Sequence, residues 1–168
     1  MAVDTILLSD FTDPRFCAAF RAYFAELDIP VRDWDGLFRE MNGEGNNRAF
    51  LLLDGEETAG FLQFQMNAFS NWFFEEPFGF IREFWVAPGY RRRGYGSLLL
   101  ERAENYFLDH GAHRVLLTAG PDAVDFYLAG GYEKAPGIRA KNQMEVLVKA
   151  LDGAEAPQIN EENKYGDD

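Results

Sequence analysis

The stretch from residue 84 to residue 100 reads Phe84-Trp85-Val86-Ala87-Pro88-Gly89-Tyr90-Arg91-Arg92-Arg93-Gly94-Tyr95-Gly96-Ser97-Leu98-Leu99-Leu100. An apolar strand stops at a proline, turns through three arginines and two alternating glycines, and enters a helix. Glycine lets the backbone approach a ligand closely and point several N–H groups in one direction. At a helix N-terminus, the unpaired N–H groups and the helix dipole both favour an anion. The stretch therefore predicts a cradle for a phosphate or a pyrophosphate.

Two familiar nucleotide-binding motifs do not fit this stretch. A Walker A loop requires Lys-Ser or Lys-Thr after its second glycine, and neither follows Gly96. A Rossmann fingerprint requires a third small residue at the position that Leu99 occupies here. Its strand and helix are also joined by a tight turn, with no basic segment like the three arginines of this chain. A basic surface turn before an ordinary helix remains the plain alternative to a ligand site.

A third motif does fit. The run Val86-x-Pro88-x-Tyr90-Arg91-x-x-Gly94-x-Gly96 closely resembles the central motif of the GNAT superfamily of acetyl-CoA-dependent N-acetyltransferases. The run Ala123-x-x-Phe126-Tyr127-x-x-x-Gly131-Tyr132 resembles the second signature of that family, a short helix bearing a tyrosine followed by the start of a strand. The order of the predicted elements matches as well, so the resemblance extends over about residues 3–151.

Apolar periodicity and turn residues divide the rest of the chain. Residues 67–78, which are rich in aromatic side chains, are predicted to form a loop. The alternation of strands and helices predicts an α/β fold, with a mixed, mostly antiparallel central sheet and helices on both faces. Helices are predicted at about 14–27, 34–41, 96–109 and 121–129, and strands at about 4–9, 48–53, 58–66, 79–87, 115–119, 132–135 and 144–151.

The composition of the chain limits the functions that it can have. The 168 residues and the 47% of hydrophobic residues suit one domain, predicted over 1–151, followed by an acidic and disordered C-terminal tail at 152–168. The formal net charge of -12 argues against nucleic acid or an anionic membrane as a partner. One cysteine and two histidines predict no metal site. No signal peptide and no membrane span is recognised, so a cytoplasmic location is expected.

The resemblance implies acetyl-CoA as the acyl donor. In the family, two neighbouring strands separate, and the pantetheine arm inserts between them by hydrogen bonds to the backbone, here that of Phe84, Trp85 and Val86. Backbone N–H groups from Arg92 to Ser97 would hold the pyrophosphate, and an arginine would reach the 3′-phosphate. The implied donor-binding residues after the strand are Arg91, Arg92, Arg93, Gly94, Tyr95, Gly96 and Ser97.

Two residues are candidate catalysts. Tyr127 matches the family tyrosine that protonates the departing thiolate, and the alternative is a core aromatic residue. Glu83, just before the motif, occupies a position where members often carry the base. The alternative for Glu83 is an ion pair with Arg82 or another arginine at an exposed strand edge. Gly120 departs from the pattern, because many members have an asparagine there, and Thr118 is a possible substitute for its contact.

The predicted loop suggests the acceptor. Aromatic faces beside carboxylates suit an amine with apolar or cationic bulk, and the candidate acceptor-binding residues are Trp72, Phe73, Glu75 and Glu76. Glu75 and Glu76 are also alternative bases. The aromatic residues alternatively fill the core or cover a second subunit, which leaves a homodimer open.

These observations favour an N-acetyltransferase that moves an acetyl group directly from acetyl-CoA to the primary amine of a small, cationic acceptor. Three alternatives stay open. One is a non-catalytic acyl-CoA-binding module with a partner-binding surface. This alternative stays open because the chain has Gly120 where many family members have an asparagine. The others are an acetyltransferase for protein N-termini or lysine side chains, and a structural dimer.

Overall fold

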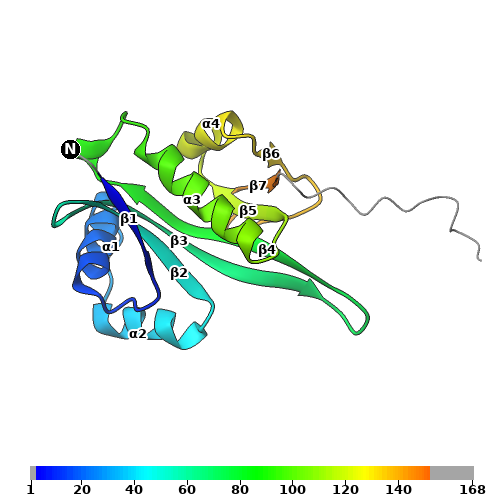
Figure 1. Cartoon of the computed structure of the whole chain (residues 1–168), viewed down its shortest axis with the longest axis horizontal. Coiled ribbons are helices and arrows are strands. Elements are labelled where there is room, and N and C mark those ends of the chain that lie inside the picture. Colours follow the sequence, from blue (N-terminus) through cyan, green and yellow to red (C-terminus); the bar gives the residue numbers. More distant parts are fainter. Residues whose placement is uncertain (1–2, 152–168) are drawn as a thin grey trace, which may run out of the picture.

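A central sheet flanked by helices on both faces forms the molecule in the computed structural model, which describes residues 3–151 (Figure 1). The strand order within these residues is β1-β2-β3-β4-β5-β7-β6, in which only the β4–β5 pair is parallel. This confirms the predicted mixed, mostly antiparallel α/β fold. The strands are β1 Asp4–Leu8, β2 Asn47–Asp54, β3 Glu57–Ser70, β4 Glu75–Val86, β5 Arg114–Ala119, β6 Glu133–Lys134 and β7 Glu145–Ala150.

Four helices and one short 3₁₀ turn connect the strands in the described part of the chain. The predicted acidic tail at 152–168 lies outside the described residues. No helix between residues 3 and 151 is both long enough and apolar enough to span a bilayer. The helices are α1 Pro14–Glu26, α2 Trp34–Glu44, α3 Tyr95–Asp109 and α4 Pro121–Ala129, and the 3₁₀ turn is η1 Pro88–Tyr90.

Helices α1 and α2 cover one face of the first half of the sheet (Figure 1). The Asp13 carboxylate caps α1 by accepting a hydrogen bond from the Arg15 N–H, and Asp33 caps α2 in the same way through Gly36. Gly45, with a φ of 79°, ends α2 in the left-handed conformation that favours glycine. The helices bury an aromatic cluster against the sheet, made of Phe11, Phe16, Phe20, Phe38 and Phe61.

Helix α3 covers the opposite face together with α4 (Figure 1). The fully buried residues Leu99, Ala103 and Phe107 recur at the spacing of one helix face. They pack against Phe64 and Leu117 from the sheet. The two faces therefore have separate apolar cores, with the central strands β3 and β4 between them.

Gly79 in β4 makes room for α3. A Cβ atom built at Gly79 would lie 2.5 Å from the Phe107 ring, well inside contact distance. We expect Gly79→Ala to destabilise the fold by about 1–3 kcal/mol, because overpacking shifts the ring or the strand. The melting temperature should fall by about 2–4 °C for each kcal/mol.

The matched control is Gly43→Ala on α2, where an added Cβ meets no heavy atom within 4 Å. Alanine is the better helix former by about 1 kcal/mol, so this variant should melt at or above the wild-type temperature. Equal melting temperatures for Gly79→Ala and the wild type would contradict the close packing of Phe107 on β4.

The prediction of a loop at 67–78 is wrong. Strands β3 and β4 pair continuously out to Ser70 and Glu75, so only residues 71–74 form the turn. The ring of Phe69 stacks on that of Phe78 at 4.4 Å, and such a cross-strand aromatic pair stabilises a ladder. Pro77 is tolerated because this part of β4 is an edge, since β5 pairs with β4 only from Gly79 onward.

The pairing between β4 and β5 is short. It joins Gly79–Ile81 to Val115–Leu117, and β4 then continues to Val86 with β3 as its partner in the described chain. The β3–β4 register shifts between Gln63 and Phe64, which leaves Arg82 as an extra residue in β4. A bulge of this kind bends a strand and re-aims its side chains. The sheet therefore opens between β4 and β5 just beyond Ile81.

Candidate active site

The N-terminus of α3 lies at one end of this opening. Gly94 has a φ of 81° and precedes the helix without a side-chain cap, and the first helical hydrogen bond runs from the Leu98 N–H to the Gly94 carbonyl at 3.1 Å. The preceding N–H groups therefore have no partner within the helix, which favours an anion. A cavity of about 310 Å³ lies here, lined by Val86, Arg91, Arg92, Gly94, Tyr95, Gly96, Ser97 and Phe126.

The three arginines of the motif differ in their contacts. Arg91 donates through Nε to the Val86 carbonyl at 2.9 Å and forms an ion pair with Glu26 of α1 at 2.5 Å. The Arg93 guanidinium lies 5.6 Å from the centre of the Tyr90 ring. Arg92 is exposed, has a φ of 64°, and has no ion-pair partner within residues 3–151. Arg92 and Arg93 are thus the arginines available to a ligand.

Glu26 also contacts strand β4 through Trp85. Its second carboxylate oxygen accepts a hydrogen bond from Trp85 Nε1 at 2.8 Å. The bonds from Trp85 and Arg91 hold the pKa of Glu26 below its usual value. Trp85 packs with the α1 side of the sheet, whereas Phe84 packs on the other face against Phe126 and Tyr127.

The Glu83 carboxylate is held by a tyrosine. The Tyr23 hydroxyl of α1 donates a hydrogen bond to Glu83 Oε2 at 2.7 Å. Burial raises the pKa of Glu83, while the Tyr23 bond and the Arg82 charge partly oppose that rise. Arg82 itself pairs with Glu44 at 3.0 Å, and β4 is an internal strand of the sheet. The proposed Arg82–Glu83 pair at an exposed edge is therefore not what the structure shows.

Tyr127 lies on α4, with only 7% of its surface exposed. Its hydroxyl has no hydrogen-bond partner among residues 3–151, whereas the hydroxyl of the half-buried Tyr23 is bonded to Glu83. Burial and the negative charge of Glu83 raise the pKa of Tyr127 above its usual value. The phenol therefore stays protonated at neutral pH. The Tyr127 ring packs against Phe84, the neighbour of Glu83 on β4, with the two ring centres 6.4 Å apart, so both predicted catalytic residues lie beside the opening.

The candidate acceptor residues of the hairpin are placed elsewhere. Trp72 and Phe73 lie at the turn between β3 and β4, almost fully exposed, and the hairpin extends away from the rest of the molecule (Figure 1). Glu75 precedes Glu83 by eight residues of strand, or roughly 27 Å. Glu76 forms an ion pair with Arg114. None of these four residues is brought together with Glu83 and Tyr127.

Tyr23 and Phe126 are site residues that the sequence did not single out as functional. Tyr23 is 60 residues from Glu83 in the chain, and its only signal was a hydroxyl on the apolar face of a helix. Phe126 lies where a Cβ at Gly96 would meet its ring at 3.4 Å, so it forms a wall of the cavity at the start of α3.

A second cavity, of about 600 Å³, lies on the sheet between the base of the hairpin and the segment that joins β6 to β7. Thr118 lines it at the end of β5. Its walls are mainly apolar, with Arg139 and Lys141 also in the lining. A Cβ at Gly120 would meet no heavy atom within 4 Å, so the position of the family asparagine is open. The apolar lining residues are Phe69, Phe78, Phe80, Leu116, Leu117, Ile138, Ala140 and Val146.

Solved structures with the same fold are numerous. An acetyltransferase from Thermus thermophilus is 21% identical, with 90% of this chain and 98% of that one covered and a TM-score of 0.67. An aminoglycoside acetyltransferase from an uncultured soil metagenomic sample, in complex with sisomicin, is 20% identical over 76% and 86% of the two chains, with a TM-score of 0.63. Arabidopsis thaliana NAA60 in complex with acetyl-CoA is 15% identical over 90% and 100%, with a TM-score of 0.67.

No curated protein matches the chain by sequence. The model of the acetyltransferase (GNAT) family, however, matches residues 7–132, which include α1, the central motif and α4. The match covers both runs that carry the resemblance, the one around Gly94 and the one around Tyr127. The chain therefore belongs to the acetyltransferase (GNAT) family.

Proposed function

We propose that this protein moves the acetyl group of acetyl-CoA directly to the primary amine of a small acceptor. The observation that carries the proposal is that Tyr127, whose hydroxyl has no hydrogen-bond partner among residues 3–151, packs against Phe84, the neighbour of Glu83, where β4 no longer pairs with β5 and next to the uncapped start of α3. A base, an acid and an anion site then lie around one gap in the sheet. The NAA60 structure in complex with acetyl-CoA supports the choice of donor.

The residues at the opening fit the parts of the donor. The N–H groups from Arg92 to Ser97 would hold the pyrophosphate, with Arg92 or Arg93 reaching the 3′-phosphate. The backbone of Phe84–Val86 would bond the pantetheine arm, because this part of β4 no longer pairs with β5. The thioester would then lie near Glu83 on β4 and Tyr127 on α4. No metal takes part in the proposed chemistry.

A substitution at Gly96 tests whether the start of α3 binds the pyrophosphate of acetyl-CoA. We expect Gly96→Val to weaken the binding of acetyl-CoA by about tenfold or more, equivalent to about 1.4 kcal/mol. The added side chain occupies the space between the start of α3 and Phe126 that the cavity needs. Titration calorimetry with acetyl-CoA measures the effect.

Gly89→Val is the matched control, because it lies in the adjoining turn and its Cβ would meet no heavy atom within 4 Å. Its affinity for acetyl-CoA should equal that of the wild type. Equal affinity in Gly96→Val and Gly89→Val would show that the donor does not use this cradle.

Glu83 serves as the base in this proposal. An amine arrives mostly as an ammonium, and a carboxylate with a raised pKa is a better proton acceptor than an exposed one. The Tyr23 hydrogen bond holds the carboxylate in place while leaving its other oxygen for the ammonium. The freed amine nitrogen then bonds to the acetyl carbon as the carbon–sulfur bond breaks.

Tyr127 then donates its proton to the departing sulfur, and the resulting phenolate takes up the second proton that the acylated nitrogen loses, while Glu83 returns its own proton to the solvent. The charge of Glu83 is one cause of the raised pKa of Tyr127. When Glu83 accepts the proton of the ammonium, that charge disappears and the phenol becomes a stronger acid. The base and the acid are therefore electrostatically coupled, so that the first proton transfer favours the second.

The acceptor would approach from the face of the sheet that carries Glu83. The carboxylate of Glu83 on this face, which forms no ion pair within residues 3–151, would attract a cationic amine. Relatives with solved structures act on different acceptors: one is an aminoglycoside acetyltransferase, and the NatC complex was solved bound to Gag peptide and CoA. Small cationic amines are our first choice, and peptide amines are the second.

The experiment is the release of CoA thiol from acetyl-CoA in the presence of polyamines, aminoglycosides, amino acids or short peptides. We expect turnover with one class of cationic amine. Turnover with peptides alone would replace the small acceptor by a protein N-terminus or a lysine. Binding of acetyl-CoA without release on any amine would favour a non-catalytic acyl-CoA-binding module, and Gly120→Asn would then test whether the missing asparagine is the cause.

A further inference from the structure

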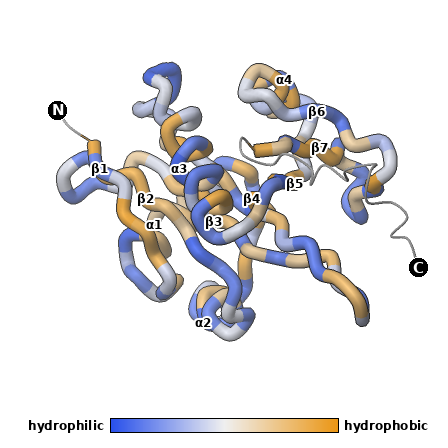
Figure 2. The backbone as a smooth tube through the Cα atoms, turned by 45° about the vertical axis from the view of Figure 1, so that its right-hand side comes forward, coloured by the Kyte–Doolittle hydropathy of each residue, from blue (hydrophilic) through white to orange (hydrophobic). Residues whose placement is uncertain are grey.

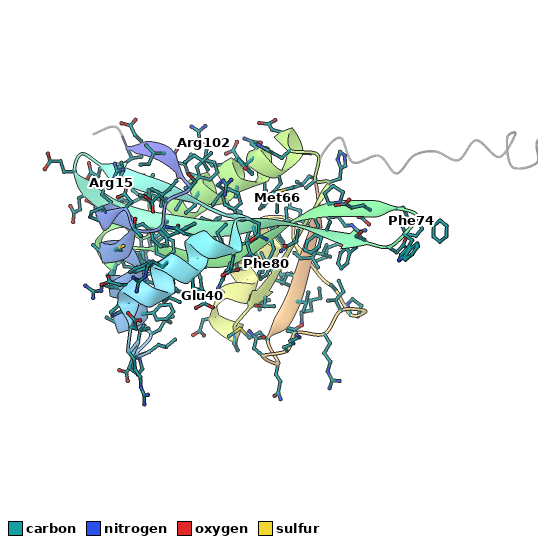
Figure 3. All side chains as sticks on the ribbon, turned by 90° about the horizontal axis from the view of Figure 1, so that it is seen from below. Arg15, Glu40, Met66, Phe74, Phe80 and Arg102 are labelled. Carbon is teal, nitrogen blue, oxygen red and sulfur yellow. The ribbon has the colours of Figure 1, made fainter. Side chains whose placement is uncertain are left out.

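The turn of the β3–β4 hairpin carries the most exposed aromatic side chains of the described chain. We call residues 70–76 the aromatic arm. The exposed fractions are 99% for Trp72, 91% for Phe73 and 73% for Phe74. Figure 2 shows the tip as hydrophobic, and Figure 3 shows Phe74 pointing away from the body of the molecule. So much clustered apolar surface marks an interaction site.

The arm is held in shape rather than collapsed onto the body. The Asn71 side chain accepts hydrogen bonds from the N–H groups of Phe73 and Phe74 at 2.8 and 3.1 Å. The Asn71 N–H donates to the Phe74 carbonyl at 3.0 Å. These bonds fix the turn with its rings outward, so little ordering is needed when a partner binds.

A groove complementary to the arm lies on the same chain. Helices α1 and α2 cover the face of β1–β4, but the cavity of about 600 Å³ shows that the face formed by the hairpin base, β5 and β7 is hollow. We call this cavity the arm groove. Its walls include Phe80, Leu116 and Ile138, and Arg139 and Lys141 supply positive charge. The arm carries the carboxylate of Glu75, which has no ion-pair partner within residues 3–151.

We propose that two copies of this chain associate by inserting the aromatic arm of each copy into the arm groove of the other. Apolar rings then meet apolar walls, and Glu75 of one copy meets Arg139 and Lys141 of the other. Because the arm and the groove adjoin on one face of the sheet, a two-fold axis beside them satisfies both contacts at once and closes the assembly.

The exposed area supports a dimer. A buried aromatic side chain contributes about 150–250 Å², so the three exposed rings of the arm offer roughly 500 Å². A stable interface buries about 800 Å² per partner, and the groove supplies further area. The net charge of -12 disfavours an anionic membrane as the occupant. The proposal does not depend on acetyl transfer.

The first test is sedimentation equilibrium of the full chain. We expect a dimer for the wild type and a monomer for the triple variant Trp72→Ser, Phe73→Ser, Phe74→Ser. The three replaced aromatic side chains are so exposed that their loss should not destabilise the folded monomer. The control is Leu27→Ser with Ile29→Ser, which removes apolar side chains that are 50% and 45% exposed outside the arm and the groove. It should remain a dimer.

Exchanging the charges at Arg139 and Glu75 tests whether the arm of a second copy occupies the arm groove. Arg139→Glu and Glu75→Lys should each weaken the dimer, and their combination should recover part of the loss, because the contact of opposite charges is restored. A monomeric wild type at about 100 μM, where a contact of about 5.5 kcal/mol would be seen, overturns the proposal. An unchanged dimer in the triple variant overturns it too, as does binding of the monomer to uncharged phosphatidylcholine vesicles through the arm.

Discussion

Tyr127→Phe is expected to lower kcat by about 10²–10⁴-fold, the usual loss on removing a general acid. The change removes one oxygen atom from a side chain that is 7% exposed and keeps the ring that packs on Phe84 and Tyr132. The hydroxyl has no hydrogen-bond partner within residues 3–151, so its loss should not weaken the fold. The affinity for acetyl-CoA should therefore stay near that of the wild type. Steady-state kinetics and calorimetry measure the two quantities.

Tyr132→Phe is the matched control for this variant. Tyr132 is 2% exposed, its hydroxyl is also without a partner among the described residues, and its ring centre lies 5.6 Å from that of Tyr127. Removing an unpaired buried hydroxyl should leave kcat unchanged and keep or raise the melting temperature. A wild-type kcat in Tyr127→Phe, or an equal loss in both variants, would show that Tyr127 is a packing residue.

Glu83→Gln is expected to lower kcat/KM by about 10²–10⁴-fold, because the amide cannot accept the proton of the ammonium. In the wild type, kcat/KM should fall on the acidic side through the pKa of Glu83, which burial raises above its usual value. The variant should lose this acidic limb. The pH profile of kcat/KM therefore separates a base from a carboxylate that only shapes the site.

Two further variants make this assignment specific. Tyr23→Phe removes the hydrogen bond that lowers the pKa of Glu83, so the acidic limb should move to higher pH with a smaller loss of kcat/KM. Glu76→Gln, on the same strand but paired with Arg114, should leave kcat/KM unchanged. An unchanged acidic limb in Glu83→Gln would assign the base to another group.

Stability gives an independent check on the same carboxyl group. A pKa raised on folding means that the folded state binds the proton more tightly, so stability decreases as pH rises from the unfolded pKa, about 4.3, through the folded pKa. Glu83→Gln removes this decrease. The variant should therefore melt above the wild type at about pH 8 and at a similar temperature below about pH 4.

The central motif could be predicted because its function depends on local sequence. A proline that stops the strand, two glycines and a helix start all lie within residues 86–97, and the structure places a left-handed Gly94 and an uncapped helix there. The second run was predictable for the same reason, since Pro121 begins and Gly130 ends the short helix α4 that carries Tyr127. Local conformation alone set these features.

Contacts between distant segments were not predictable. The bond from Tyr23 to Glu83 joins residues 60 apart, and it requires the packing of α1 on β4. The hairpin at 67–78 was missed because Asn71, Pro77 and their neighbours are turn formers, whereas the ladder with its stacked Phe69 and Phe78 is set by cross-strand pairing. In both cases tertiary contacts outweigh local preference.

Direct transfer of the acetyl group at the opening beside Glu83 and Tyr127 is tested most directly by a single-turnover reaction. The enzyme, in excess over acetyl-CoA labelled in its acetyl group, is quenched at short times after mixing with an acceptor amine that supports thiol release. We expect the label to pass to the amine nitrogen without ever being bound to the protein, and Tyr127→Phe to slow this transfer. Label held covalently on the protein, or released only as acetate, would contradict it.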